Sequence, residues 1–416
     1  MIARAVRVGA EALRLLARVS LARIVVRDER ERAARVGAEL AASLERLGGA
    51  FHKGGQFLST RPDLLGEELR RPLGRLCDRA EPPSPRVTEG ALAAALTAAP
   101  RAEIAAVEPR PVACGSVAQV HLATLRDGRT VALKLLRPDA GRRFRADLAL
   151  GRAGASLLAR VPRLRSVPVR AGFDQLSASL AAHLDLPLEA RRQRLLRERL
   201  RDEDGVVVPE LEEDLCGERV LAMEYVPGAV RVDDPRLAPE ARRRALRTGL
   251  RVLYRMIFEL GIVHCDFHPG NLLATVSGEL VVLDFGYVAT VPDETRRRFR
   301  EFFLAIALAD DELAARVIVE TAEAGAPPDP AALEDDLREL LQRVHGASAA
   351  EFQVAGLVAR LFEIQRRHGI RGTPAFTTSI LALVSYEGLL KLFEPSLDFQ
   401  REAMPYVLRD EVLATS

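Results

Sequence analysis

Residues 263–271 read Val-His-Cys-Asp-Phe-His-Pro-Gly-Asn, and residues 280–286 read Leu-Val-Val-Leu-Asp-Phe-Gly. Asp266 precedes Asn271 by five residues and Asp284 by eighteen residues. Carboxylate and amide oxygens are the hard ligands that Mg²⁺ takes together with the phosphates of a nucleotide. Two unrelated loops with chance acids explain this joint spacing poorly, so the two segments predict one divalent-metal and phosphate site.

The same spacing is typical of the catalytic loop and the metal-binding Asp-Phe-Gly turn of kinases. In that arrangement Asn271 and Asp284 hold the metal, and Asp266 orients or deprotonates the attacking hydroxyl. After Gly286 a new helix is predicted from about residue 293, and no Ala-Pro-Glu sequence follows Gly286, since the one at residues 238–240 lies upstream of the Asp-Phe-Gly turn. The sequence therefore leaves no room for the long segment on which protein kinases dock a polypeptide. Small-molecule kinases carry similar loops, so the phosphoryl acceptor stays open.

A β-hairpin is predicted upstream of these loops. Residues 117–125 and 130–136 are apolar runs, and the Asp127-Gly128 pair between them is a two-residue turn signal. Lys134 falls on the second strand, where kinases carry the lysine that grips the α- and β-phosphates.

Lysine is rare in this chain. Only Lys53, Lys134 and Lys391 are lysines among the 60 basic residues, so 57 are arginines. A planar guanidinium cannot replace a compact ammonium in a tight pocket, which favours functional roles for the first two lysines. Glu189, on the helical stretch that follows, is the expected ion-pair partner of Lys134, with Asp185 and Glu198 as alternatives.

Two further segments are candidates for nucleotide contacts. Small residues at Ala113, Cys114, Gly115 and Ser116 fill the position of a loop that covers phosphates, although the usual glycine pattern is missing. Glu224 lies in the expected hinge between two lobes, where backbone groups would meet an adenine.

The order of predicted elements suggests an α+β, mostly helical chain with two lobes and a cleft between them. Residues 1–48 have the composition and periodicity of helix. Strand-rich sequence then precedes helix-rich sequence. We expect a helical extension over residues 1–105, a smaller lobe with a helical insert over 106–227, and a helical larger lobe over 228–416.

Composition excludes several classes of protein. The formal charge is only +2, so no global basic field argues for nucleic acid. Four dispersed cysteines predict reduced thiols rather than a disulfide framework. No run of 18 apolar residues occurs, so we expect no transmembrane span. Before Arg27 the only acid is Glu11, against five arginines: Arg4, Arg7, Arg14, Arg18 and Arg23. We expect this stretch either to form an ordinary solvated face or to contact an anionic membrane electrostatically.

Residues 51–63 read Phe-His-Lys-Gly-Gly-Gln-Phe-Leu-Ser-Thr-Arg-Pro-Asp, and Lys53 to Gln56 match a KxGQ signature. This segment resembles the UbiB/AarF/ADCK family of atypical kinase-like proteins, and the resemblance extends from about residue 47 to about residue 395. It implies a two-lobed kinase-like fold with a helical extension that points Lys53 and Gln56 at the nucleotide.

The resemblance also carries two departures. The family has an ExD motif where this chain has His183-Leu184-Asp185, so Asp185 alone remains to pair with Lys53 in a latch between extension and lobe. The loop that is usually Ala-Ala-Ala-Ser in the family contains Gly115 here, which resembles an ordinary kinase loop. Neither departure removes a metal ligand.

The resemblance implies an atypical kinase-like ATPase that binds ATP or ADP with Mg²⁺, or with Mn²⁺ as an alternative metal. Such a protein supports isoprenoid quinone biosynthesis or lipid handling at a membrane, with quinone precursors, lipid or pathway enzymes as partners. A cytoplasmic location, peripheral at the inner membrane surface, is expected, and a homodimer is left open. The alternatives are a phosphotransferase acting on a protein or small molecule, and a nucleotide-gated scaffold without turnover.

Overall fold

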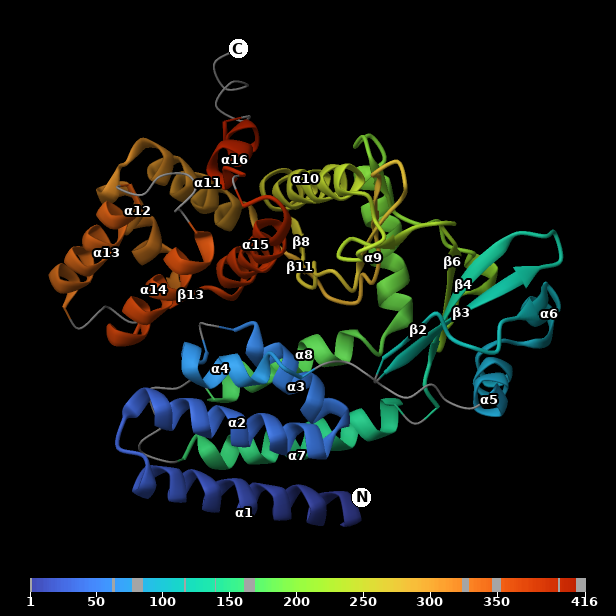
Figure 1. Cartoon of the computed structure of the whole chain (residues 1–416), viewed down its shortest axis with the longest axis horizontal. Coiled ribbons are helices and arrows are strands. Elements are labelled where there is room, and N and C mark those ends of the chain that lie inside the picture. The colour runs from blue at the N-terminus through green and yellow to red at the C-terminus, as the bar shows by residue number, and fades with distance from the viewer. Residues whose placement is uncertain are drawn as a thin grey trace. The chain divides into compact units, whose positions relative to one another are not determined.

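The computed structural model describes residues 2–61, 64–76, 85–115, 117–138, 140–160, 169–323, 329–345, 353–395 and 397–408. Contacts divide the chain into two compact units (Figure 1). Unit 1 comprises residues 1–191 and 210–225, and unit 2 comprises residues 192–209 and 226–416. The boundary at 225/226 lies two residues from the expected end of the smaller lobe. Contacts do not separate residues 1–105 from the strands that follow, and the division into three domains stays a prediction.

The helical part of unit 1 is built from two sections of the chain. Its helices are α1 (Ile2–Val25), α2 (Glu29–Leu47), α3 (Gly49–Ser59), α4 (Glu67–Leu73), α7 (Ala140–Leu158) and α8 (Val169–Ala182). The predicted helix over residues 1–48 is present but broken, because Asp28 caps α2 by accepting the Glu31 N–H at 2.8 Å. Helix α1 packs on α2, and α3 packs on both α7 and α8 (Figure 1).

The sheet of unit 1 is antiparallel, in the order β1-β3-β4-β6, with β2 added on β3. Its strands are β1 (Ile104–Val107), β2 (Ala113–Cys114), β3 (Ala118–Leu125), β4 (Thr130–Leu136) and β6 (Val220–Glu224). Inward residues such as Val131, Leu133 and Leu135 bury against helix α5 (Pro85–Ala95). Short helices α6 (Ala98–Ala102) and η2 (Glu213–Leu215) lie beside this sheet.

The predicted hairpin is confirmed, but its turn is not a two-residue turn. Leu125 N–H donates to the Arg129 carbonyl at 2.8 Å, and Gly128 N–H donates to the Leu125 carbonyl at 3.0 Å. These bonds close a three-residue loop in which Gly128 has φ 89°. A type I turn followed by a left-handed glycine is the common form of such a loop.

Unit 2 is mostly helical. Its larger helices are α10 (Pro239–Arg255), α11 (Asp293–Leu308), α12 (Asp311–Glu320), α13 (Pro330–His345), α14 (Val354–Arg367), α15 (Pro374–Phe393) and α16 (Phe399–Val407). A π-helical turn, η3 (Met256–Leu260), extends α10 and ends at Gly261 with φ 65°. Helix α9 (Leu186–Leu200) begins in unit 1 and continues into unit 2.

Short strands interrupt the helices of unit 2, as the glycine-rich stretch predicts. A four-stranded sheet has the order β5-β10-β9-β7, and two-stranded ladders join β11 with β8 and β12 with β13. The strands are β5 (Val206–Val207), β7 (Val230–Arg231), β8 (Ile262–His264), β9 (Leu272–Ala274), β10 (Leu280–Val282), β11 (Val288–Thr290), β12 (Ala322–Glu323) and β13 (Arg371–Gly372).

Helix α15 is long and apolar enough to cross a membrane by length and composition, but 61% of its apolar window is buried within the protein. Tyr386 donates to the Leu246 carbonyl at 2.6 Å, and Glu387 accepts the N–H groups of Val354 and Ala355, each at 2.8 Å. These buried polar bonds identify α15 as a core helix of unit 2.

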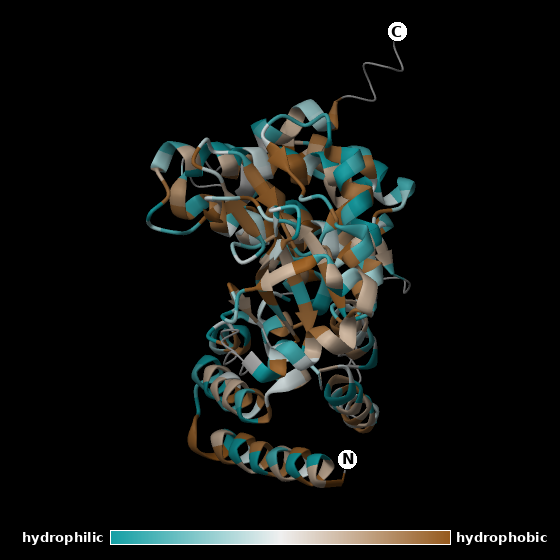
Figure 2. Cartoon of the chain, turned by 90° about the vertical axis from the view of Figure 1, so that its right-hand side faces the viewer, coloured by the Kyte–Doolittle hydropathy of each residue, from teal (hydrophilic) through white to brown (hydrophobic). Residues whose placement is uncertain are grey.

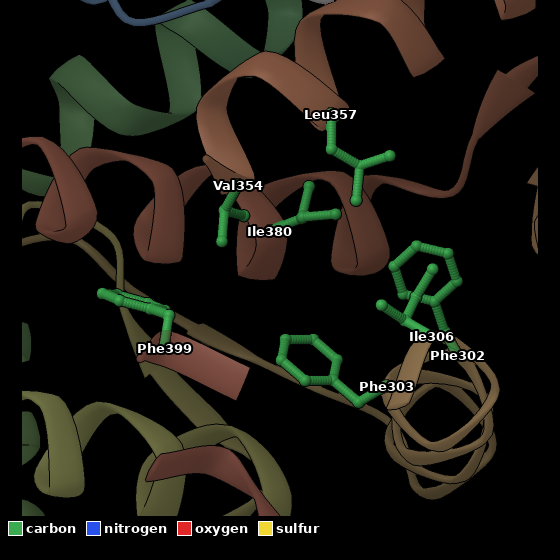
Figure 3. A pocket seen from close by; sticks show the side chains of 7 residues that line it. All are labelled: Phe302, Phe303, Ile306, Val354, Leu357, Ile380 and Phe399. Carbon is green, nitrogen blue, oxygen red and sulfur yellow. The ribbon is translucent and has the colours of Figure 1, made fainter. Parts of the chain in front are cut away.

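An apolar pocket lies among the helices of unit 2 (Figure 3). Only apolar side chains line it: Phe302, Phe303, Ile306, Val354, Leu357, Ile380 and Phe399. Six of the seven side chains are buried, so the pocket belongs to the core of the unit.

Candidate functional site

The ammonium of Lys134 lies in the interior of unit 1 rather than at the edge of its sheet. Lys134 is on β4, opposite Val120 of β3 and Leu221 of β6. Its Nζ lies 2.7 Å from Oε1 and 2.9 Å from Oε2 of Glu189, whose side chain is fully buried. The expected ion pair is therefore formed, and Glu189 is the partner among the three candidate acids. Removing one partner of such a buried ion pair strongly destabilises the folded protein.

Asp185 has a structural role that places Glu189. It precedes α9, its Oδ1 accepts the Leu188 N–H at 2.9 Å, and its carbonyl accepts the Glu189 N–H at 3.0 Å. Asp185 thus caps the helix that carries Glu189. His183 follows the end of α8, and its Nδ1 lies 2.8 Å from the Ser179 carbonyl. The sequence did not predict this capping role of Asp185. The latch between Lys53 and Asp185 stays a prediction.

Residues 113–115 of the small-residue loop fold back on strand β3. Ala113 and Cys114 form β2 and pair with Val120 and Gln119 of β3. Gly115 N–H donates to the Ala118 carbonyl at 2.9 Å. Ser116 lies outside the described residues. A loop without large side chains at these positions can approach a phosphate through its backbone.

The KxGQ segment is helix α3, and its glycines allow close packing within unit 1. A Cβ on Gly55 would lie 2.4 Å from Leu76 Cδ1 and 2.9 Å from Leu44 Cδ1. Gln56 Nε2 donates to the Leu76 carbonyl at 3.1 Å, and Lys53 is half-buried on the same helix. Gln56 therefore ties α3 to the turn that follows α4, a contact that the sequence did not indicate.

Gly55→Ala should be less stable than Gly54→Ala by about 1 kcal/mol, the low end for overpacking, because the added methyl displaces the terminal methyl groups of Leu76 and Leu44. Gly54→Ala is the matched control, since its Cβ would lie 3.4 Å from Leu176 Cδ2, an ordinary contact. Urea unfolding of both variants checks this. Equal midpoints for the two variants would show that α3 is not packed as described.

Glu224 lies at the end of β6 and is exposed. Its N–H donates to the Glu210 carbonyl at 2.8 Å, and its Oε2 lies 3.4 Å from the Glu210 nitrogen. The backbone N–H is therefore already bonded within unit 1, and the contact of this segment with an adenine stays a prediction.

Unit 2 brings Asp266 and Asn271 together. Asn271 Nδ2 donates to the carbonyl and to Oδ2 of Asp266, both at 3.0 Å. Because its amide nitrogen faces Asp266, the Oδ1 of Asn271 faces away and can accept a cation. His268 Nε2 lies 3.3 Å from Oδ1 of Asp266, and His268 Nδ1 accepts the Gly270 N–H at 2.9 Å.

His264 joins the two loops, and the sequence reasoning gave it no role. Its buried ring accepts the Asp266 N–H on Nδ1 at 3.2 Å, and its Nε2 lies 3.2 Å from the Leu283 carbonyl. Burial lowers the pKa of His264, so the ring is neutral and donates from Nε2. Leu283 N–H also donates to the Asn271 carbonyl at 2.9 Å. A polar residue at the end of an apolar strand was the available signal.

Asp284 has a strained backbone. Its φ of 58° is one of two positive values at non-glycine residues in the described parts of the chain. Such strain costs about 1–3 kcal/mol and concentrates at functional sites. Asp284 Oδ1 accepts the Gly286 N–H at 3.3 Å, and the fully buried Phe285 packs against the His264 ring with 5.5 Å between centroids.

The carboxylate of Asp284 and the amide of Asn271 suit a Mg²⁺ ion that also binds a nucleotide. They suit less well a metal ion coordinated by protein side chains alone. Among the described residues, no cluster of three or more His, Cys, Asp or Glu side chains could hold an ion. Asp284 and Asn271 offer one carboxylate and one amide oxygen, and Mg²⁺ in nucleotide sites takes its other ligands from phosphates and water. Burial raises the pKa of the Cys265 thiol to about 12, so the thiol is protonated at neutral pH.

The connection after the Asp-Phe-Gly turn is short, as predicted. Strand β11 begins at Val288, pairs with β8, and is followed by α11 at Asp293. This leaves a few residues where a protein kinase has a long docking segment.

A kinase-like fold, a buried lysine–glutamate pair and a catalytic loop with its Asp-Phe-Gly turn define the class of protein. The family model of the ABC1 atypical kinase-like domain matches residues 75–318. The chain belongs to this family, and the resemblance inferred from the KxGQ and kinase-type motifs is confirmed. The predicted α+β, mostly helical, kinase-like fold is confirmed as well.

The relatives of this chain include proteins named UbiB. It is 30% identical over 384 residues to a probable protein kinase UbiB of Shewanella piezotolerans, covering 89% of this chain and 69% of the relative. A probable protein kinase UbiB of Marinobacter nauticus is 30% identical over 383 residues, with the same coverage. Among solved structures, the complex of Mycobacterium tuberculosis Rv3197 with erythromycin covers 85% of this chain and 94% of that chain. Its TM-score is 0.51 at 22% identity, a likeness of fold alone.

Proposed function

We propose that this protein is an atypical kinase-like ATPase that binds ATP or ADP with Mg²⁺. The observation that carries the proposal is the hydrogen bond from the Asn271 amide nitrogen to Asp266. This bond directs the Asn271 oxygen away from the Asp266 carboxylate. The buried pair of Lys134 and Glu189 supports it, since it holds an ammonium ready for phosphate.

Each residue set has a role in this proposal. Lys134 contacts the α- and β-phosphates, and Glu189 holds the lysine in place. Asn271 Oδ1 and the Asp284 carboxylate hold the Mg²⁺, which when bound neutralises charge on the phosphates. Asp266 accepts a proton from the attacking water or hydroxyl. His264 positions Asp266 through its backbone N–H.

Water or a small acceptor is favoured over a polypeptide. The short path from Gly286 through β11 to α11 offers little surface on which a substrate peptide could dock. Support of isoprenoid quinone biosynthesis is proposed from the relatives named UbiB, with ubiquinone or menaquinone as the product and a membrane as the setting. Quinone profiles of lipid extracts from a deletion strain test that setting.

The test of the chemistry is phosphate release from labelled ATP with Mg²⁺, with and without a generic protein acceptor. We expect inorganic phosphate, with little label on protein, and at least about a hundredfold loss in Asp266→Asn, the size of an acid–base contribution. Label on the protein acceptor would favour the phosphotransferase alternative. Nucleotide binding without turnover in the wild type would favour the scaffold.

Lys53→Arg should change the ATPase rate or the nucleotide affinity severalfold without lowering the melting temperature of the nucleotide-free protein. The reason is that a planar guanidinium cannot reproduce a compact ammonium at a nucleotide. Lys391→Arg is the matched control, because Lys391 is equally half-buried but lies in unit 2, where it donates to the Pro395 carbonyl at 3.1 Å. His183→Glu, which restores the missing acid, should alter the same activity. Wild-type kinetics in both site variants would reject the role of the extension.

A further inference from the structure

Helix α1 presents a wide apolar face to solvent. Ile2, Val6, Leu13, Leu16 and Ile24 are 83, 66, 69, 58 and 80% exposed. At 3.6 residues per turn these side chains share one side of the helix. The exposed Gly9, Ala17 and Ser20 lie on the same side, which holds no acid. Figure 2 shows the apolar and polar residues alternating along this helix.

Three of the five arginines of α1 form ion pairs with acids of unit 1. Arg4 Nε lies 2.7 Å from Asp147 Oδ1 on α7, and Arg18 Nη1 lies 2.6 Å from Glu39 Oε2 on α2. Arg14 and Arg46 both contact the carboxylate of Glu11, and the hydrogen bond from Arg46 lowers the pKa of that acid. These ion pairs hold the polar side of α1 against unit 1. Acids of α1, α2 and α7 engage Arg4, Arg14 and Arg18, which favours an apolar contact. The mainly electrostatic contact expected from the sequence stays a prediction.

We infer that the outer face of α1, defined by Ile2, Val6, Leu13, Leu16 and Ile24, inserts into the surface of an anionic lipid bilayer, and that the contact is chiefly hydrophobic. An interfacial helix combines an apolar side with basic residues at its border. Arg7 and Arg14 border this face, and the side chain of Arg14 is 53% exposed. Counting the α1 arginines with Arg46 against Glu11, Glu39 and Asp147 leaves a positive local charge, which is complementary to anionic headgroups.

A second copy of the chain suits this face less well. The face is one helix about 36 Å long and roughly 10 Å wide. It offers well under the ~800 Å² per partner of a standard stable interface. Its apolar residues also cover a sector broader than the narrow seam of a coiled coil, which suits a lipid surface.

Vesicle flotation tests the inference with the full chain. Vesicles of phosphatidylcholine with phosphatidylglycerol should bind the wild type, and most binding should persist in 0.5 M salt, where exposed charges are screened beyond a few ångströms. Leu13→Gln with Leu16→Gln should reduce binding at least about tenfold at unchanged charge, since two large apolar side chains no longer insert. Both positions are exposed, so the melting temperature should stay as in the wild type.

Arg23→Gln is the control, since it removes an exposed charge at the border of the face and keeps the apolar residues. It should retain most of the binding. Loss of binding in salt, together with an equal loss in Arg23→Gln, would overturn the hydrophobic contact. Concentration-dependent dimers that the glutamine pair abolishes, without vesicle binding, would assign the face to a second copy instead.

This inference does not depend on the ATPase. The glutamine pair should hydrolyse ATP in solution like the wild type, and Asp284→Asn should still float with vesicles. Failure of the membrane contact and failure of the nucleotide site are therefore read in separate assays.

Discussion

Asp284→Asn should abolish the stabilisation of this protein by ATP and Mg²⁺. Asparagine tolerates the left-handed conformation that Asp284 adopts, with φ 58°, and it has the same size. The substitution therefore removes only the negative charge that is proposed to hold the metal. In a thermal-shift titration at 100 times the dissociation constant, the wild type should gain about 2.7 kcal/mol, and the variant should gain none.

Two controls separate charge from folding. Asp293→Asn changes a carboxylate that is 93% exposed at the start of α11 and should leave the nucleotide shift intact. Asp284→Gly relieves the positive φ, so the nucleotide-free protein should be no less stable than the wild type. A full nucleotide shift in Asp284→Asn would reject the metal assignment.

Glu189→Gln should lower the free energy of unfolding by about 3–5 kcal/mol, because it removes the carboxylate that lies 2.7 Å from the buried ammonium of Lys134. Lys134→Met combined with Glu189→Leu should recover most of that stability, since two apolar side chains carry no desolvation penalty. Neither variant should be stabilised by ATP and Mg²⁺. Urea unfolding with and without nucleotide measures both effects.

Glu198→Gln is the matched control on the same helix. Glu198 is exposed near the end of α9, and its loss should change stability by less than about 0.5 kcal/mol. If the double variant were as unstable as Glu189→Gln alone, an uncompensated charge could not be the cause of the loss. Packing around β4 and α9 would then explain it.

Local signals made much of the fold predictable. The hairpin of β3 and β4 follows from Asp127-Gly128 between apolar runs, and the catalytic loop follows from the spacing of Asp266, Asn271 and Asp284. The turn of the hairpin was mispredicted because the same dipeptide serves both two- and three-residue loops. Choosing the latter depends on the Leu125–Arg129 bond, which sequence alone does not specify.

Tertiary partners could not be predicted in the same way. Sequence left Glu189, Asp185 and Glu198 as candidates for Lys134, and the choice depends on α9 starting at Leu186 with Asp185 as its cap. The direction of the Arg4 side chain depends on Asp147, more than a hundred residues away. His264 escaped notice because its role consists of contacts with the backbone of two other residues.

The scarcity of lysine gives this protein an unusual chemical handle. An amine-directed acylating reagent meets only three side-chain amines in 416 residues. The amine of Lys134 is enclosed with Glu189, whereas Lys53 and Lys391 are both half-buried, so Lys134 should react much more slowly than the other two in the folded protein. Peptide mapping after brief labelling can thus report, one lysine at a time, how a nucleotide changes access to the proposed site without any engineered probe.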